Sequence, residues 1–398
     1  MGKRLLTALV AILALGLALQ VPGVAGEGVP KARLISDLAY PATVLVYAEI
    51  NGEVDTPDWV GIPASIWCLG TGFFVNPHGY LVTCGHVVFA FDNTDPMQDS
   101  VVRYYLLYSA ALNLVDYLRG QGYVLTSEDV EQIIEYVLTY GRVTWTSLDV
   151  YVILGEALGA DIEAKGIKAR VVAKSPFLEK DVAILKIDLE NTPTLPLGDS
   201  DKVEMGEEVY AVGYPAAVTF HEMLNPETML IPSITKGIVS ARRKTRYDTP
   251  ALQTDVEVSY GHSGGPALSG KGEVIGVVNM GSIDPERGVV VAGFNFLVPS
   301  NIVEDFLREN GIENERGIAD ELYEEALALF YAKCYDSAVE KLNELLNVFP
   351  YHWYAKKLVA EAQEAMARGE RAGSSMELSA PVSYTHLRAH ETEAELVC

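Results

Sequence analysis

The chain has 398 residues, with 30 Lys and Arg against 54 Asp and Glu, which gives a formal net charge of −24. Because single domains mostly span roughly 100–200 residues, this length predicts two or more structural units. The acidic balance argues against a nucleic-acid-binding protein, which needs a basic face to displace counterions. Since 49% of the residues are apolar and only 21% are charged, disorder throughout the chain is not expected.

The N-terminal residues 1–26 are typical of a secretory signal. Lys3 and Arg4 precede the largely apolar stretch 5–19, and small residues follow at 23–26. The apolar stretch is short for a membrane-spanning helix, which needs ~20 residues, although an uncleaved N-terminal anchor is the alternative. In either case we expect the rest of the protein to lie outside the cytoplasm.

The C-terminal residues 371–398 predict a disordered tail. Within it, residues 382–392 resemble the translation of a transposase-type sequencing adapter. On that interpretation, 382–398 is a cloning or assembly artefact, and we assign it neither fold nor chemistry.

The four cysteines are too few and too scattered for a disulfide scaffold; they are Cys68, Cys84, Cys334 and Cys398. The first two flank a predicted hairpin. If Val75 pairs with Tyr80 in that hairpin, the sulfurs of Cys68 and Cys84 point to opposite faces, so no bridge between them is expected. Without a CxxC pair or a DxDxDG loop, we expect no metal and no cofactor.

Between the two ends, short β-rich runs with Gly-rich turns predict an all-β barrel or sandwich. Residues 93–143 interrupt the strands with a helical insert, because apolar residues recur at helical spacing over 101–119 and 128–140. The predicted strands are 43–47, 72–75, 80–83, 148–154, 169–173, 182–187, 208–213, 237–241, 251–256, 272–279 and 289–298.

Residues 306–370 are predicted to be helical, with helices at 319–332, 336–348 and 353–366. The placement of Ala326, Ala338 and Pro350 resembles a tetratricopeptide repeat, and a plain helical hairpin that caps the preceding domain is the alternative. The repeat-like interpretation suggests a protein partner at these helices.

Three motifs carry chemistry. Ser263 lies in the glycine-rich run 261–266, where the backbone can turn several N–H groups toward one oxyanion. His86 follows a predicted strand and is placed to act as a base, and Asp181 begins another strand and is placed to hold the far imidazole nitrogen. The order His, Asp, Ser is that of the chymotrypsin arrangement.

These segments together resemble the trypsin-like serine proteases, specifically the high-temperature-requirement (Do-like) branch. The resemblance implies two antiparallel six-stranded β-barrels of the chymotrypsin type within a protease domain at 31–305. The matching stretches are 70–73, 79–83, 86–88, 181–187, 195–201, 213–215, 236–240, 253–255, 261–266 and 272–276.

Carried over residue by residue, the resemblance implies that His86 is the general base, Asp181 its orienting partner and Ser263 the nucleophile. The backbone N–H groups of Gly261 and Ser263 would form the oxyanion hole, which His262 lines. A substrate strand would pair with the edge formed by Val278, Asn279 and Met280.

The sequence departs from the family in four ways. His262 stands where Asn or Asp is usual, and helices rather than a PDZ-like segment follow residue 301. A helical insert separates His86 from Asp181, and the connection between 213 and 236 is long. We therefore predict an extracytoplasmic serine endopeptidase that acts on polypeptides, with no prediction of its oligomeric state. The alternative is a catalytically weak or inactive protease-fold protein that serves as a chaperone or a peptide-binding scaffold.

Overall fold

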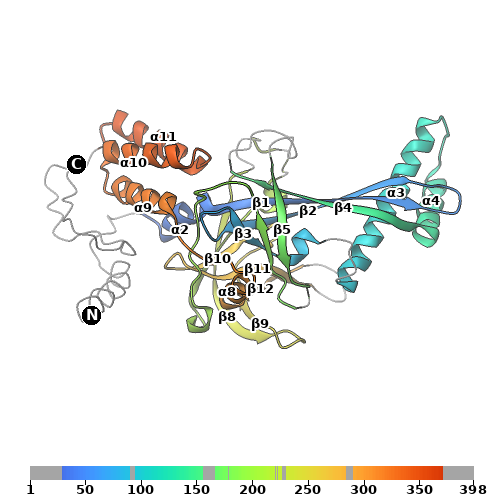
Figure 1. Cartoon of the computed structure of the whole chain (residues 1–398), viewed down its shortest axis with the longest axis horizontal. Coiled ribbons are helices and arrows are strands. Elements are labelled where there is room, and N and C mark those ends of the chain that lie inside the picture. Colours follow the sequence, from blue (N-terminus) through green and yellow to red (C-terminus); the bar gives the residue numbers. More distant parts are fainter. Residues whose placement is uncertain are drawn as a thin grey trace.

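The computed structural model contains two closed antiparallel barrels of six strands each, confirming the predicted fold class (Figure 1). It describes residues 29–89, 95–155, 166–177, 179–219, 221, 223–225, 230–283 and 290–370. The predicted signal at 1–26 and the predicted tail at 371–398 lie outside these residues. None of the helices in the described ranges is long and apolar enough to cross a bilayer.

Each barrel is a closed ring of hydrogen-bonded neighbours. The first runs in the order β1 (Thr43–Asp55), β2 (Ile62–Phe74), β3 (Tyr80–Thr83), β6 (Ala183–Lys186), β5 (Ile167–Lys174) and β4 (Arg142–Ile153). The second runs in the order β10 (Pro266–Ser269), β11 (Val274–Ile283), β12 (Val290–Pro299), β9 (Pro250–Thr254), β8 (Ser233–Lys244) and β7 (Glu208–Gly213). The sequence pattern located every one of these strands except β10, which lies inside the glycine-rich motif.

Three strands of the first barrel are much longer than predicted. β1, β2 and β4 continue past the barrel as an arm, at whose end the helical insert packs (Figure 1). Their outer apolar residues, Ile50, Val54, Ile62 and Ala64, form a core cluster with the insert. The prediction ended β1 early and began β2 and β4 late, because a partner far away in the sequence buries their outer halves.

The insert is a pair of helices, α3 (Pro96–Gly120) and α4 (Ser127–Tyr140), as the apolar spacing predicted. Asp95 caps α3 by accepting hydrogen bonds from the N–H groups of its first turn. Thr126 and Asp129 form a capping box at the start of α4. Polar caps at both N-termini therefore fix where the helices begin.

The hairpin of β2 and β3 has the predicted register. Phe73 lies opposite Val82, and the N–H of Val75 donates to the oxygen of Tyr80 at 3.0 Å. Cys68 and Cys84 are both free and buried. The prediction that no bridge joins them is confirmed.

Further helices follow the last strand of the second barrel (Figure 1). α8 (Ser300–Glu309) packs into the barrel core through Val303, Phe306 and Leu307. Three further helices form their own core, and they are α9 (Ile318–Tyr331), α10 (Tyr335–Val348) and α11 (Trp353–Ala367). The predicted helices at 319–332, 336–348 and 353–366 agree with these bounds to within one residue.

A buried carboxylate joins this helical unit to a helix that the sequence analysis missed, α2 (Lys31–Ala39). Asp37 is fully buried and forms an ion pair with Arg33 at 2.8 Å. The hydroxyls of Tyr331 and Tyr354 both donate to its carboxylate. Burying such a charge requires this number of donors, so α2, α9 and α11 are held in one fixed arrangement.

Candidate active site

The three predicted catalytic residues come from both barrels. His86 lies in a short 3-10 helix, η2 (Gly85–Val88), just after β3, and Asp181 precedes β6. Ser263 lies in the turn between β9 and β10 of the second barrel. The N–H of Thr71 in β2 donates to the main-chain oxygen of Ser263 at 2.8 Å, which fixes the nucleophile's turn against the first barrel.

Asp181 contacts His86 through both of its carboxylate oxygens. Its Oδ2 lies 2.7 Å from His86 Nδ1, and its Oδ1 accepts the backbone N–H of His86 at 2.8 Å. Asp181 adopts a left-handed conformation with φ 49°, which Asp tolerates better than most residues. This backbone turn before β6 directs the carboxylate toward the imidazole. Because Asp181 contacts Nδ1, the other nitrogen of His86, Nε2, is the one that can accept a proton.

The electrostatics of the pair suit a general base. Burial lowers the pKa of His86, but the negative charge of Asp181 and the hydrogen bond to it outweigh burial, so the pKa lies above the ordinary 6.5. Phe177 packs edge-on against the imidazole, with ring centroids 5.6 Å apart. His86 is therefore held in place and kept basic.

The Ser263 hydroxyl donates to an acceptor other than His86. Its Oγ donates to the main-chain oxygen of Asn279 at 3.0 Å. Catalytic hydrogen bonds are often loose in a site without substrate and tighten when substrate binds. To act as nucleophile, Ser263 would therefore have to exchange Asn279 for His86 as its hydrogen-bond partner.

The turn before Ser263 presents its backbone donors outward. The N–H of His262 donates to the Ser259 oxygen at 3.0 Å, which closes a four-residue turn. Within this turn Tyr260 has a negative φ and Gly261 a φ of +98°, the combination found in a type II turn. The Tyr260 oxygen accepts from the N–H of Ala216 at 2.8 Å. Since the carbonyl and N–H of a trans peptide point in opposite directions, the Gly261 N–H faces away from Ala216.

Among the described residues, the N–H groups of Gly261 and Ser263 have no protein acceptor. They are thus available to an oxyanion. Gly261 is also required sterically, because a Cβ there would lie 2.3 Å from the oxygen of Tyr214.

His262 is almost completely buried and holds this turn from within. Its Nδ1 accepts the backbone N–H of Ser259 at 3.1 Å. Burial lowers the pKa of His262, so the ring is neutral at ordinary pH. The imidazole therefore contributes packing and one hydrogen bond to the turn, while its backbone N–H closes the turn rather than facing an oxyanion.

Comparison with known proteins identifies the family. Residues 70–277 match the trypsin-like peptidase domain. The chain belongs to this family. The match spans both barrels and contains His86, Asp181 and Ser263.

The curated relatives confirm the predicted resemblance to the Do-like branch. A probable periplasmic serine endoprotease DegP-like of Pseudomonas putida strain F1 is 34% identical over 189 residues, covering 47% of this chain and 33% of the relative. The serine protease Do-like HtrA of Lactobacillus helveticus is 30% identical over 197 residues, covering 49% and 44%. The chain thus matches less than half the length of either relative. The solved HtrA-type protease AlgW with decapeptide aligns with TM-score 0.42 and 19% identity, covering 71% of this chain and 67% of that one.

The predicted substrate edge of this trypsin-like peptidase lies in β11. The N–H of Val278 donates to Gly265 at 2.9 Å and its oxygen accepts from Gly264 at 2.8 Å, so both main-chain groups of Val278 are used within the protein. Met280 pairs with Phe296 of β12 on the other side. A substrate that adds a strand here therefore has to begin at Asn279 or beyond.

The structure gives Asn279 a contact that sequence reasoning missed. Its side-chain Nδ2 donates to Asp181 Oδ2 at 2.9 Å. The local sequence cannot predict this contact, because 98 positions separate Asn279 from Asp181. The two residues meet only once the two barrels have packed together.

Cys84 is the other side chain beside the pair. The ligand atoms of Cys84, His86 and Asp181 lie within 4.8 Å of one another, a spacing that also suits a metal ion. However, the Cys84 thiol donates to Val278 at 3.2 Å, and burial raises its pKa well above the ordinary value. Because Asp181 already accepts three hydrogen bonds, this geometry fits proton transfer better than metal binding.

Proposed function

We propose that this chain is a serine endopeptidase that hydrolyses peptide bonds of extracytoplasmic polypeptides. The observation that carries the proposal is the bidentate contact of Asp181 with His86, adjacent to a serine whose turn presents two free N–H groups. Each of these parts is needed for acyl transfer, and they come from three distant segments of the chain.

The reaction follows from the geometry. Ser263 Oγ attacks the scissile carbonyl carbon while His86 Nε2 removes the hydroxyl proton. The N–H groups of Gly261 and Ser263 stabilise the oxyanion. His86 then gives its proton to the leaving amine, and an acyl-enzyme remains. His86 then deprotonates a water, which attacks the ester carbonyl. The ester bond to Ser263 breaks, His86 returns the proton to Ser263 Oγ, and the acid product leaves.

The charge of Asp181 stabilises the imidazolium that forms in each half of the reaction. Its hydrogen bond to Nδ1 also keeps Nε2 free to accept a proton. This division of roles explains why a fully buried carboxylate lies against the imidazole rather than against a lysine or arginine.

The proposed location outside the cytoplasm is supported by the signal-like residues 1–26 and by the word periplasmic in the names of the Pseudomonas relatives. Polypeptide substrates are supported by the family, a trypsin-like peptidase domain, and by the serine endoprotease relatives. The cleavage preference is best obtained by profiling a peptide library.

A fluorophosphonate probe tests the proposal directly. We expect covalent labelling of the purified protein at Ser263, and loss of labelling and of peptide hydrolysis in Ser263→Ala. Ser100→Ala, at an exposed serine on α3, is the matched control and should be labelled like the wild type. A folded protein that neither reacts with the probe nor cleaves any peptide would contradict the proposal and favour the binding-scaffold alternative.

A further inference from the structure

An exposed group of tyrosines lies on α3. Tyr104, Tyr105 and Tyr108 are 51%, 53% and 37% exposed. The ring of Tyr104 stacks on that of Tyr108 and meets that of Tyr105 edge-on, with centroids 6.4 and 5.3 Å apart. These rings pack against one another while remaining open to solvent.

These tyrosines give α3 a second apolar face. The first face, which includes Leu106, Ala110 and Leu114, is buried in the core of the arm. The second follows the spacing of one helical stripe and is exposed, consisting of Val101, Tyr104, Tyr105, Tyr108 and Leu112. A surface helix normally needs only one apolar face, so the second face indicates a binding surface.

The contacts between α3 and β2 place this face along the arm of the first barrel. Ser109 Oγ accepts the N–H of Ser65 at 3.0 Å, and Asn113 Nδ2 donates to Pro63 at 2.8 Å. From the first contact to the second, α3 advances by four residues, about 6 Å, while β2 goes back by two residues, about 6.6 Å. The helix and the strand therefore run antiparallel at nearly the same rise. One further step in this register brings Tyr105 level with Trp67 along β2.

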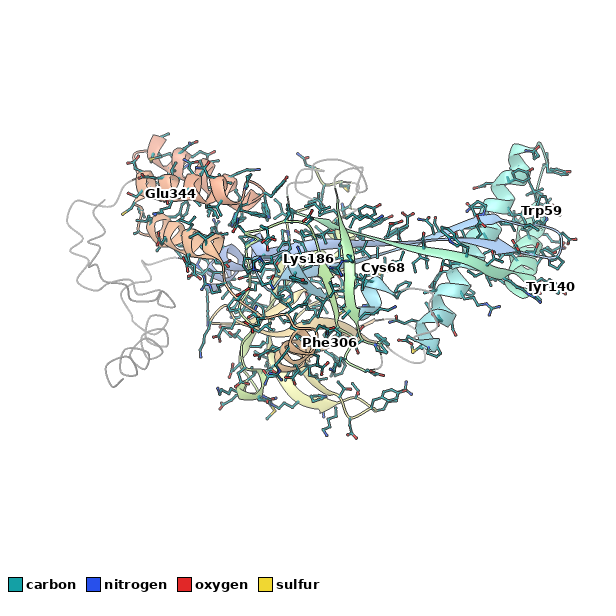
Figure 2. All side chains as sticks on the ribbon, in the orientation of Figure 1. Trp59, Cys68, Tyr140, Lys186, Phe306 and Glu344 are labelled. Atoms are coloured by element: carbon teal, nitrogen blue, oxygen red, sulfur yellow. The ribbon has the colours of Figure 1, made fainter. Side chains whose placement is uncertain are left out.

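From Trp67 the aromatic side chains continue to the catalytic turn. Trp67 is 55% exposed and stacks on Tyr47, with ring centroids 6.4 Å apart. The next residue, Cys68, lies where the barrel meets the arm (Figure 2), and its sulfur is 3.9 Å from the hydroxyl of Tyr260. Tyr260 is 65% exposed and only three positions before Ser263.

Tyr105 also lies close enough to Tyr260 to affect the pKa of its phenol. The pKa of Tyr260 is raised, first by burial of its hydroxyl, then by Cys68 and by the charge of Tyr105. This coupling agrees with the placement deduced from the α3–β2 contacts. An aromatic surface consisting of Trp67, Tyr104, Tyr105, Tyr108 and Tyr260 therefore extends from the catalytic turn to the insert.

The lack of charge on this aromatic surface indicates what kind of molecule binds to it. None of its five side chains is charged at neutral pH, although the chain as a whole carries −24. Two copies of so acidic a chain repel each other, which disfavours self-association. Tyrosine and tryptophan bind apolar side chains through their rings and peptide groups through their polar atoms.

We propose that the aromatic surface binds the part of a polypeptide substrate that lies outside the cleft, through aromatic and large aliphatic side chains of that substrate. The inference rests on the proposed function for its catalytic consequence. It assigns the helical insert the role of favouring long, apolar polypeptides over short peptides.

Two substrates and two variants test the assignment. The substrates are a short peptide selected from a cleavage library and the same peptide extended at either end by a segment rich in Phe and Leu. In the combined variant Tyr104→Ser, Tyr105→Ser, Tyr108→Ser, we expect kcat/KM for the extended peptide to fall about tenfold or more. The kcat/KM for the short peptide should stay unchanged.

The matched control replaces three tyrosines elsewhere that are at least as exposed, in the combined variant Tyr123→Ser, Tyr140→Ser, Tyr247→Ser. It should cleave both peptides like the wild type. Equal cleavage of the extended peptide by the wild type and the α3 variant would overturn the assignment. So would a fall in molar mass of the α3 variant in light scattering, since a second copy would then occupy the surface.

Binding without turnover separates this inference from the proposed function. Ser263→Ala protein should bind the labelled extended peptide more tightly than the short one in fluorescence anisotropy. The three α3 substitutions added to Ser263→Ala should remove that difference. This result can be obtained even if the wild type cleaves nothing, whereas equal binding with and without the tyrosines rejects the aromatic surface.

Discussion

Asn279 contacts Asp181 and Ser263 at once. Its side chain donates to Asp181 Oδ2 at 2.9 Å, and its main-chain oxygen accepts the Ser263 hydroxyl at 3.0 Å. A single residue of the second barrel therefore touches both the carboxylate of the first barrel and the nucleophile. This contact ties the relative position of the barrels to the alignment of the site.

Replacing Asn279 should weaken chemistry more than binding. Asn279→Ala removes a donor from a buried carboxylate, an interaction of about 1.5–3 kcal/mol, so we expect kcat to fall about ten- to a hundredfold with little change in KM. The matched control is Asn310→Ala, which removes a similar amide contact to Phe306 at the end of α8. Steady-state kinetics that show only a raised KM would assign Asn279 to substrate binding instead.

The turn that holds the oxyanion donors should not tolerate a side chain at Gly261. A Cβ would lie 2.3 Å from Tyr214, so Gly261→Ala has to turn its N–H away from the site. We expect kcat to fall by about 10²–10³, as on loss of one oxyanion donor. Gly206→Ala is the control, because Gly206 also has a positive φ but open space around its Cβ position. Wild-type rates in Gly261→Ala would refute this geometry.

The pH dependence of kcat/KM should report the raised pKa of His86. Only neutral imidazole accepts the serine proton, so activity is lost as the pH falls through this pKa, and the acid limb should lie above 6.5. Phe177→Ala would admit water to the ring that Phe177 now covers. Because burial lowers the pKa of His86, that variant should move the limb to higher pH. A shift to lower pH would contradict the account.

Stability should fall as Asp320 ionises. Burial raises the pKa of Asp320 from 3.8 to about 6, so the folded state binds the proton more tightly than the unfolded state. The unfolding free energy should therefore decrease by up to about 3 kcal/mol as the pH rises from 3.8 to about 6.

Urea titrations of the wild type and Asp320→Asn across this range measure that contribution as a difference. The variant should lack the decline, whereas Asp336→Asn, at an exposed aspartate on α10, should retain it. Parallel pH curves for the wild type and Asp320→Asn would show that Asp320 titrates normally.

The sequence determined the barrels and the identity of the three candidate catalytic residues. Strands such as β7 were predicted to the residue because short apolar runs bounded by glycine turns are local signals. His86, Asp181 and Ser263 were found because each lies at a strand end or in a turn whose local sequence is distinctive. None of these inferences required knowing which segments meet.

Tertiary structure decided what depends on distant partners. The arm strands run past their predicted ends because α3 buries their outer residues, and α2 is helical where its polar Asp37 meets the C-terminal helices. In the same way, Asn279 reaches Asp181 only after the barrels pack. Burial and hydrogen bonding between residues far apart in the sequence leave no local periodicity, which is why these features emerged only in the folded chain.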